Sequence, residues 1–240
     1  IYLFTRKKEY ALSLYNAVNN TDYSNTEDLE FKKLENVLFI RMKNDASFIF
    51  DSAMNLYEHQ SSFSQNMPLR GLFYFADLYR KLIPTDSLYQ KKRIKIPVPK
   101  YIVFYNGPVS DMKTDKEEQH LSDAFQVRDK TGGFEWTATI LNINPGYNEE
   151  LFSKCDILWE YTLFVEKVKR KSKCMEPDEA MREAVRESLA EGILKDFFKE
   201  YGEEIMSMEW YEVDQEMIAE IQFREALEDA RVEGMALGIE

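Results

Sequence analysis

The sequence predicts an α/β fold for this chain of 240 residues, and three observations carry the prediction. Amphipathic helical stretches alternate with short apolar runs along residues 1–175. Near residue 52, a polar turn separates two runs with the alternation of β-strands. The hydrophobic fraction of 44% and the aromatic fraction of 14% are typical of a folded chain with a sizeable core.

The first elements follow from periodicity. Residues 9–20 form an amphipathic helix, with Ala11, Leu14, Tyr15 and Val18 at helical spacing. A polar loop at 25–31 precedes a short apolar strand at 36–40. Residues 44–62, NDASFIFDSAMNLYEHQSS, then predict a β-hairpin whose turn is Ser52 and Ala53.

Helices and strands continue to alternate after the hairpin. Residues 66–84 predict a helix with Asn66 as its cap and Pro68 in its first turn. We expect its core face to be Leu69, Leu72, Phe73, Ala76 and Tyr79. Strands follow at 101–105 and within 135–146, then one helical stripe over 149–171, a helix over 177–201 ended by Gly202, and a last helix over 214–234.

Charge divides the chain at residue 175. The net charge is −12, but residues 176–240 hold 20 acidic and 6 basic residues, whereas residues 1–175 carry a net +2. We therefore predict a first domain at 1–175 and an acidic helical extension at 176–240. The extension either packs on the core, mediates homo-oligomer formation, or masks basic surface. The basic clusters at 91–100 and 167–173 either contact phosphates or are solvated.

Few residues suit a transition-metal site. The two cysteines, Cys155 and Cys174, and the two histidines, His59 and His120, exclude a standard zinc centre. Free thiols predict a reducing, cytoplasmic location. No run of 18 apolar residues is present, so no membrane span is expected.

The hairpin carries the candidate site. In the predicted register, Asp45 lies opposite Gln60, and Glu58 lies one same-face step away, roughly 7 Å along the strand. Two carboxylates so close repel each other unless a cation lies between them, and such oxygen ligands suit Mg²⁺. Gln60 would orient a water or a phosphate oxygen. The same pattern also occurs on solvated hairpins, so that alternative stays open.

The order helix, strand, hairpin with Asp…Glu-x-Gln, helix, strand resembles the restriction-endonuclease-like PD-(D/E)XK core. Residues 11–82 closely resemble the PD-(D/E)XK nuclease family transposases, which belong with the recombination-promoting nuclease (Rpn) group of bacteria. The stretches KYIVFYNG at 100–107 and AEGILKDFFKEYGEEI at 190–205 match that family too. The resemblance implies a central mixed sheet flanked by helices.

It further implies a DNA endonuclease dependent on Mg²⁺, with Mn²⁺ as the alternative metal. Asp45 and Glu58 would be metal ligands, and Gln60 would replace the usual lysine as third catalytic residue. Lys43, Arg70 and Tyr74 would contact substrate. The alternatives are a solvated strand-edge lysine at Lys43, and a solvated face with a buried hydroxyl at Arg70 and Tyr74. Glu9 and Glu35 are weaker candidate ligands, and His59 reads as a packed side chain.

A rival hypothesis is a catalytically silent nuclease-like scaffold that binds a protein partner. Gln60 in place of lysine and the net charge of −12 favour it, because negative charge opposes nonspecific DNA affinity. The Asp45–Glu58 pair favours the nuclease. An RNA-directed nuclease would share the same chemistry.

Overall fold

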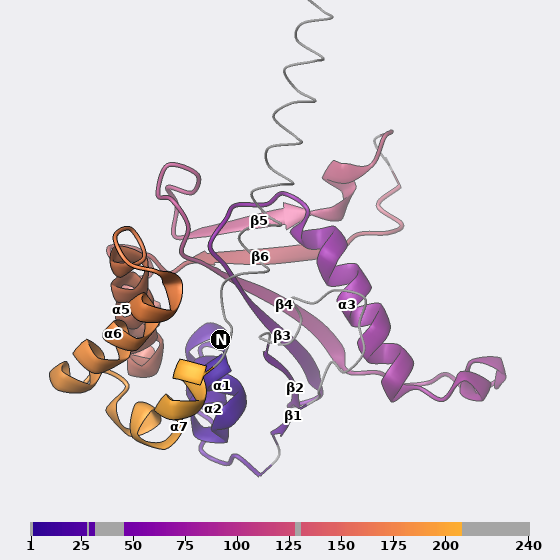
Figure 1. The fold of residues 1–240 in the computed structure, drawn as a ribbon. Coiled ribbons are helices and arrows are strands. Elements are labelled where there is room, and N and C mark those ends of the chain that lie inside the picture. Colours follow the sequence, from indigo (N-terminus) through magenta and orange to yellow (C-terminus); the bar gives the residue numbers. More distant parts are fainter. Residues whose placement is uncertain (1, 28, 32–45, 128–130, 208–240) are drawn as a thin grey trace, which may run out of the picture. The chain divides into compact units, whose positions relative to one another are not determined.

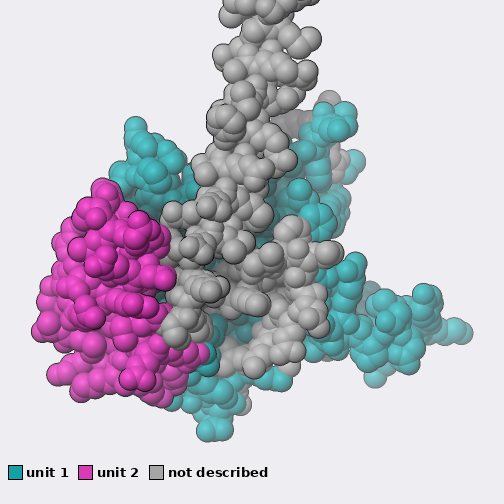
Figure 2. Space-filling view, in the orientation of Figure 1, with its two compact units in different colours: residues 1–163 teal, residues 164–240 magenta. Residues whose placement is uncertain are grey.

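The computed structural model describes residues 2–27, 29–31, 46–127 and 131–207. These residues form an α/β fold in which helices flank a mixed sheet (Figure 1). The chain divides into two compact units, 1–163 and 164–240, coloured separately in Figure 2. Their boundary lies within helix α5, before the predicted position at residue 175.

The sheet has six strands in the order β1-β2-β3-β4-β6-β5. Strands β3 and β4 pair in parallel, as do β4 and β6, and the three other pairs are antiparallel. The strands are β1 (Glu30–Phe31), β2 (Ala46–Phe50), β3 (Ala53–Gln60), β4 (Val98–Tyr105), β5 (Lys116–His120) and β6 (Thr137–Asn142). The predicted strand at 36–40 lies outside the described residues.

The predicted hairpin is confirmed as β2 and β3, but its turn is one residue earlier than expected. Asp51 and Ser52 have φ angles of 47° and 60°, the left-handed pair that a two-residue hairpin turn requires. Phe50 therefore pairs with Ala53, and Ala46 pairs with Tyr57. The register that placed Asp45 opposite Gln60 is wrong by two residues, and Asp45 itself is not among the described residues.

Helix α3 (Met67–Leu82) covers one face of the sheet (Figure 1). It connects β3 to the parallel strand β4, a pairing that needs such a crossover. Its buried side chains include Tyr74, Phe75 and Leu78. Of the predicted core face, Tyr79 packs against the core, but Phe73 is 51% exposed and Leu69 is 38% exposed, so the prediction is wrong for those two.

Helix α2 (Lys8–Asn19) packs on the other face of the sheet, as its periodicity predicts. Tyr15 contacts the rings of Phe48 and Phe50 at 6.3 and 4.9 Å between centroids. Tyr57 of β3 continues this aromatic layer toward Phe104 of β4. Helix α1 (Tyr2–Arg6) precedes α2 in the chain.

The predicted helical stripe at 149–171 is two helices, α4 (Glu149–Lys154) and α5 (Asp156–Lys171). They separate at Cys155, whose φ of −144° and ψ of 83° are not helical. The Cys155 thiol is buried and lies 3.5 Å from the Ser13 hydroxyl, whereas Cys174 is exposed.

The predicted helix at 177–201 is also two helices, α6 (Pro177–Glu191) and α7 (Lys195–Ser207). Gly192, with a φ of 81°, ends α6, and Gly202 lies inside α7 rather than ending it. The predicted helix at 214–234 falls outside the described range. Among the helices that the structure describes, none is both long and apolar enough to cross a membrane.

One carboxylate of α6, that of Glu187, pairs with three cations of α5 in the second unit. Glu187 accepts hydrogen bonds from Lys167 and Arg170 at 2.7 Å and forms an ion pair with Lys171 at 2.7 Å. Hydrogen bonds from Lys167, Lys171 and Arg170 lower the pKa of Glu187 to about 2. Three cations of the basic cluster at 167–173 are thus paired with a carboxylate of α6.

Candidate functional site

Glu58 and Gln60 lie at the carboxyl end of β3, on the face that α3 covers. Side chains alternate along a strand, so residues 54, 56, 58 and 60 share this face. Met54 and Leu56 fill the core beneath α3, and Glu58 continues that row with only 1% of its surface exposed. The prediction that Glu58 and Gln60 share one face is confirmed.

Three side chains donate hydrogen bonds to the Glu58 carboxylate. The Gln60 amide and the Arg70 guanidinium both donate to Oε1, and the Tyr101 hydroxyl of β4 donates to Oε2. A buried carboxylate is costly unless its charge is paired and hydrogen-bonded, and this cluster supplies both. We call Glu58, Gln60, Arg70, Tyr74 and Tyr101 the Glu58 cluster.

Arg70 and Tyr74 occupy successive turns of α3 above the carboxylate. The Arg70 Nη2 group lies 3.0 Å from the Tyr74 hydroxyl, and the Arg70 side chain keeps 23% of its surface exposed. Burial lowers the pKa of Arg70, but Glu58, Tyr74 and Tyr101 together outweigh it and hold that pKa above its ordinary value. Tyr74 is only 2% exposed, which matches the buried-hydroxyl alternative of the sequence analysis.

The close approach of α3 to β4 depends on Gly71. A Cβ atom at this position would lie 2.5 Å from Cδ1 of Tyr101 and 2.9 Å from Nε1 of Trp136. Gly71 therefore lets the helix pass over the ring whose hydroxyl reaches Glu58. Neither Gly71 nor Tyr101 was predicted as part of the site. Tyr101 becomes recognisable only once β4 is known to run parallel to β3.

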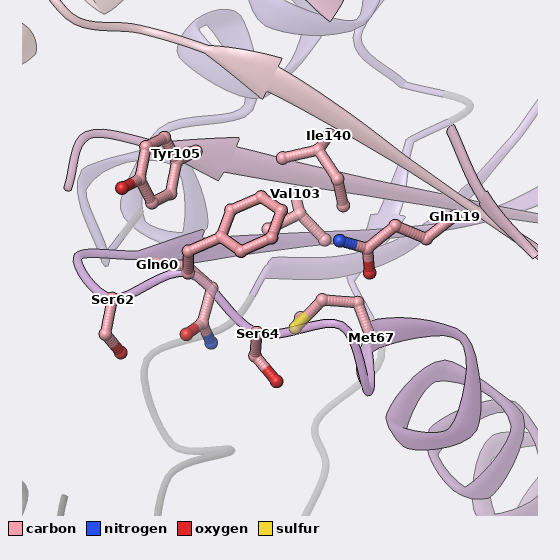
Figure 3. A pocket seen from close by; sticks show the side chains of 9 residues that line it. Gln60, Ser62, Ser64, Met67, Val103, Tyr105, Gln119 and Ile140 are labelled. Atoms are coloured by element: carbon pink, nitrogen blue, oxygen red, sulfur yellow. The ribbon is translucent and has the colours of Figure 1, made fainter. Parts of the chain in front are cut away.

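A small hollow lies beside the Glu58 cluster (Figure 3). Gln60, Phe63, Met67 and Gln119 are among its lining residues. Its free interior is about 10 Å³, which is room for one water molecule. Gln119 is 7% exposed, and its Oε1 atom has no hydrogen-bond partner within the described part of the chain. The hollow is too small for an organic ligand.

Of the remaining predicted residues, only Glu9 and His59 are described, and neither joins the cluster. Asp45, Lys43 and Glu35 lie outside the described residues. Glu9 is exposed on α2, which packs on the opposite face of the sheet. His59 points to that opposite face as predicted, and its ring lies 5.8 Å from the ring of Tyr161.

The Glu58 cluster offers two oxygen ligands to a cation, the Glu58 carboxylate and the Gln60 amide oxygen. Both are ligand types that Mg²⁺ accepts, so the residues fit the ion in kind. No group of three or more His, Cys, Asp or Glu side chains suited to a metal occurs within the described ranges. Arg70 already neutralises Glu58, so any cation at this carboxylate has to compete with the guanidinium.

Comparison with protein-family models, with curated proteins and with solved structures gave no match to this chain.

Proposed function

We propose that this protein is a metal-dependent nuclease that hydrolyses phosphodiester bonds in DNA. The observation that carries the proposal is the Glu58 carboxylate, buried at the carboxyl end of β3 beside the parallel strand β4. Ligand and catalytic sites in sheets with parallel strands form at that edge. A buried carboxylate surrounded by polar donors is also a candidate functional group on electrostatic grounds.

The proposed division of roles uses residues from three segments. Glu58 and Asp45, the residue directly before β2 in the sequence, would hold Mg²⁺ or Mn²⁺, with Gln60 orienting a water or a phosphate oxygen. When bound, the metal would stabilise negative charge on the phosphate and lower the pKa of a bound water. Arg70, released from Glu58, can donate to phosphate oxygens through its planar guanidinium.

The Arg70–Glu58 ion pair also favours a second candidate function. A carboxylate that is already paired and hydrogen-bonded needs no metal, and such a cluster can serve simply to fix α3 on the sheet. In that case the protein would be a catalytically silent scaffold that binds a partner protein. Plasmid cleavage separates the two functions.

The experiment measures nicking of supercoiled plasmid by the full chain in Mg²⁺, in Mn²⁺ and in EDTA. The variants are Glu58→Gln and Asp45→Asn, which keep side-chain shape and remove charge. Glu117→Gln is the matched control, because Glu117 lies on the same face of the same sheet, in the strand β5, outside the Glu58 cluster. Circular dichroism confirms that each variant is folded.

We expect metal-dependent nicking by the wild type and by Glu117→Gln, and a loss of at least about 100-fold in the two site variants. Absence of nicking in either metal would support the scaffold instead. Nicking that persists in Glu58→Gln would place the active site elsewhere in the chain. An equal loss in Glu117→Gln would show that the effect is not specific to the cluster.

A further inference from the structure

Residues 83–97 form an arm that leaves the end of α3, extends away from the sheet and returns to β4 (Figure 1). Its base is fixed at both ends. The Ile83 amide donates to Tyr79 O at 2.8 Å, and the Tyr79 hydroxyl donates to Pro97 O at 2.6 Å. The arm contains one short 3-10 helix, η2 (Thr85–Tyr89). A tethered projection of this kind presents its side chains to solvent in a defined place.

The arm concentrates positive charge in an acidic protein. Four exposed cations lie within five positions, at Lys91, Lys92, Arg93 and Lys95. Within the described part of the chain, none of the four forms an ion pair or a side-chain hydrogen bond. The other basic cluster differs, because Lys167, Arg170 and Lys171 are each paired with Glu187. The arm therefore keeps a positive field available to an anionic partner.

Two large side chains beside these cations are exposed as well. Tyr89 is 86% exposed and Leu88 is 65% exposed, both in η2. A solvent-exposed tyrosine ring next to lysine and arginine has the chemistry that stacks on unpaired bases while the cations contact phosphates. We propose that the arm is a nucleic-acid contact surface, with Lys91, Lys92, Arg93 and Lys95 on backbone phosphates and Tyr89 against a base or sugar.

The position of the arm favours nucleic acid over an anionic lipid surface. Arg70 and Leu82 are twelve residues apart on α3, which corresponds to about 18 Å along the helix. That length, about five base pairs of duplex, separates Arg70 from the base of the arm, so the preference for nucleic acid over lipid rests on the proposed nuclease function. The inference goes beyond the proposed cleavage, because binding through the arm requires no chemistry at Glu58.

The test measures binding of the full chain to fluorescent duplex and single-stranded oligonucleotides by anisotropy, in EDTA, between 50 and about 200 mM salt. The arm variant combines Lys91→Gln, Lys92→Gln, Arg93→Gln and Lys95→Gln. The matched control combines Lys113→Gln, Arg182→Gln, Lys195→Gln and Lys199→Gln, four exposed cations outside the arm and outside the cluster at 167–173. Tyr89→Ala is tested separately. Vesicles containing phosphatidylserine serve as the lipid probe.

We expect the arm variant to lower the slope of log affinity against log salt by about 3 to 4 on duplex, and the control variant by less than about 1. Tyr89→Ala should weaken single-strand binding by about fivefold or more with the slope unchanged. Absence of binding at low salt, or equal slopes for the arm and control variants, would overturn the proposal. Binding to vesicles but not to oligonucleotides, lost in the arm variant, would overturn it in favour of a lipid surface. Because the assay contains no metal, its outcome is independent of whether Glu58 is catalytic.

Discussion

Arg70 and Glu58 form an ion pair in which the carboxylate is almost fully buried and the guanidinium is partly open to solvent. The Glu58 side chain is 2% exposed and the Arg70 side chain is 23% exposed. The desolvated member therefore depends on the other for its charge balance, and this asymmetry governs how the site responds to substitution.

A double-mutant cycle on this pair should show strong coupling. Glu58→Gln leaves the Arg70 charge without its partner, and Arg70→Met leaves a buried carboxylate, so we expect each to destabilise the fold by about 3 kcal/mol. The double variant should recover about 1 to 2 kcal/mol relative to the sum of the two losses. Urea denaturation gives the free energy of unfolding of the wild type and of the three variants. Simple additivity would show that the two charges do not interact in solution.

Removing the guanidinium should strengthen metal binding. In Arg70→Gln the Glu58 carboxylate loses its competing cation, so we expect Mg²⁺ and Mn²⁺ to bind about tenfold more tightly or better. Isothermal titration calorimetry measures the affinities. The matched control is Arg80→Gln, an exposed arginine of the same helix that pairs with Asp77. Unchanged affinity in Arg70→Gln would argue against Glu58 as a metal ligand.

Gly71→Ala should destabilise the protein although alanine is the better helix former. The added methyl group would overlap the Tyr101 ring, and we expect a loss of about 1 to 3 kcal/mol. Gly202→Ala in α7 is the control, because its Cβ would meet its nearest neighbour at 3.8 Å, an ordinary contact. That variant should be neutral or more stable by up to about 1 kcal/mol. Thermal unfolding compares them, and an equal effect at both glycines would contradict the packing argument.

Glu187 should make the second unit sensitive to acid. Its pKa is lowered in the folded state to about 2, so its stabilising contribution is complete above the unfolded value near 4.5 and is lost as pH falls toward 2. Glu187→Gln should therefore be less stable than the wild type at pH 6, and the difference should disappear near pH 2. Unfolding monitored at several pH values tests this. A difference independent of pH would assign the effect to packing instead of charge.

Local periodicity predicted much of the fold. The alternation of β3 is sufficient to place Glu58 and Gln60 on one face, and helical spacing correctly predicted the packed side of α2. The predicted turn, Ser52 and Ala53, lies one residue too late, because the left-handed backbone of Asp51 makes that residue the first of the turn. Strand β5 was missed because its sequence, KEEQH, lies at the edge of the sheet and is largely exposed.

The candidate site was less predictable because its interactions are not local. Hydrophobicity alone favours Leu69 and Phe73 as the core face of α3, but the helix instead turns Tyr74 and Arg70 toward the sheet. That orientation satisfies a carboxylate twelve residues earlier in the chain. Tyr101 reaches the same carboxylate across a parallel strand pair, whose register no short stretch of sequence encodes.

The two cysteines allow local unfolding of the first unit to be measured by thiol alkylation. Cys174 is exposed, so an alkylating reagent reaches it in the native state, whereas Cys155 is closed off between α4 and α5. Burial raises the pKa of the Cys155 thiol, which slows its reaction further. Alkylation of Cys155 therefore reports how often this part of the first unit opens, with Cys174 as the reference for reagent reactivity in the same tube.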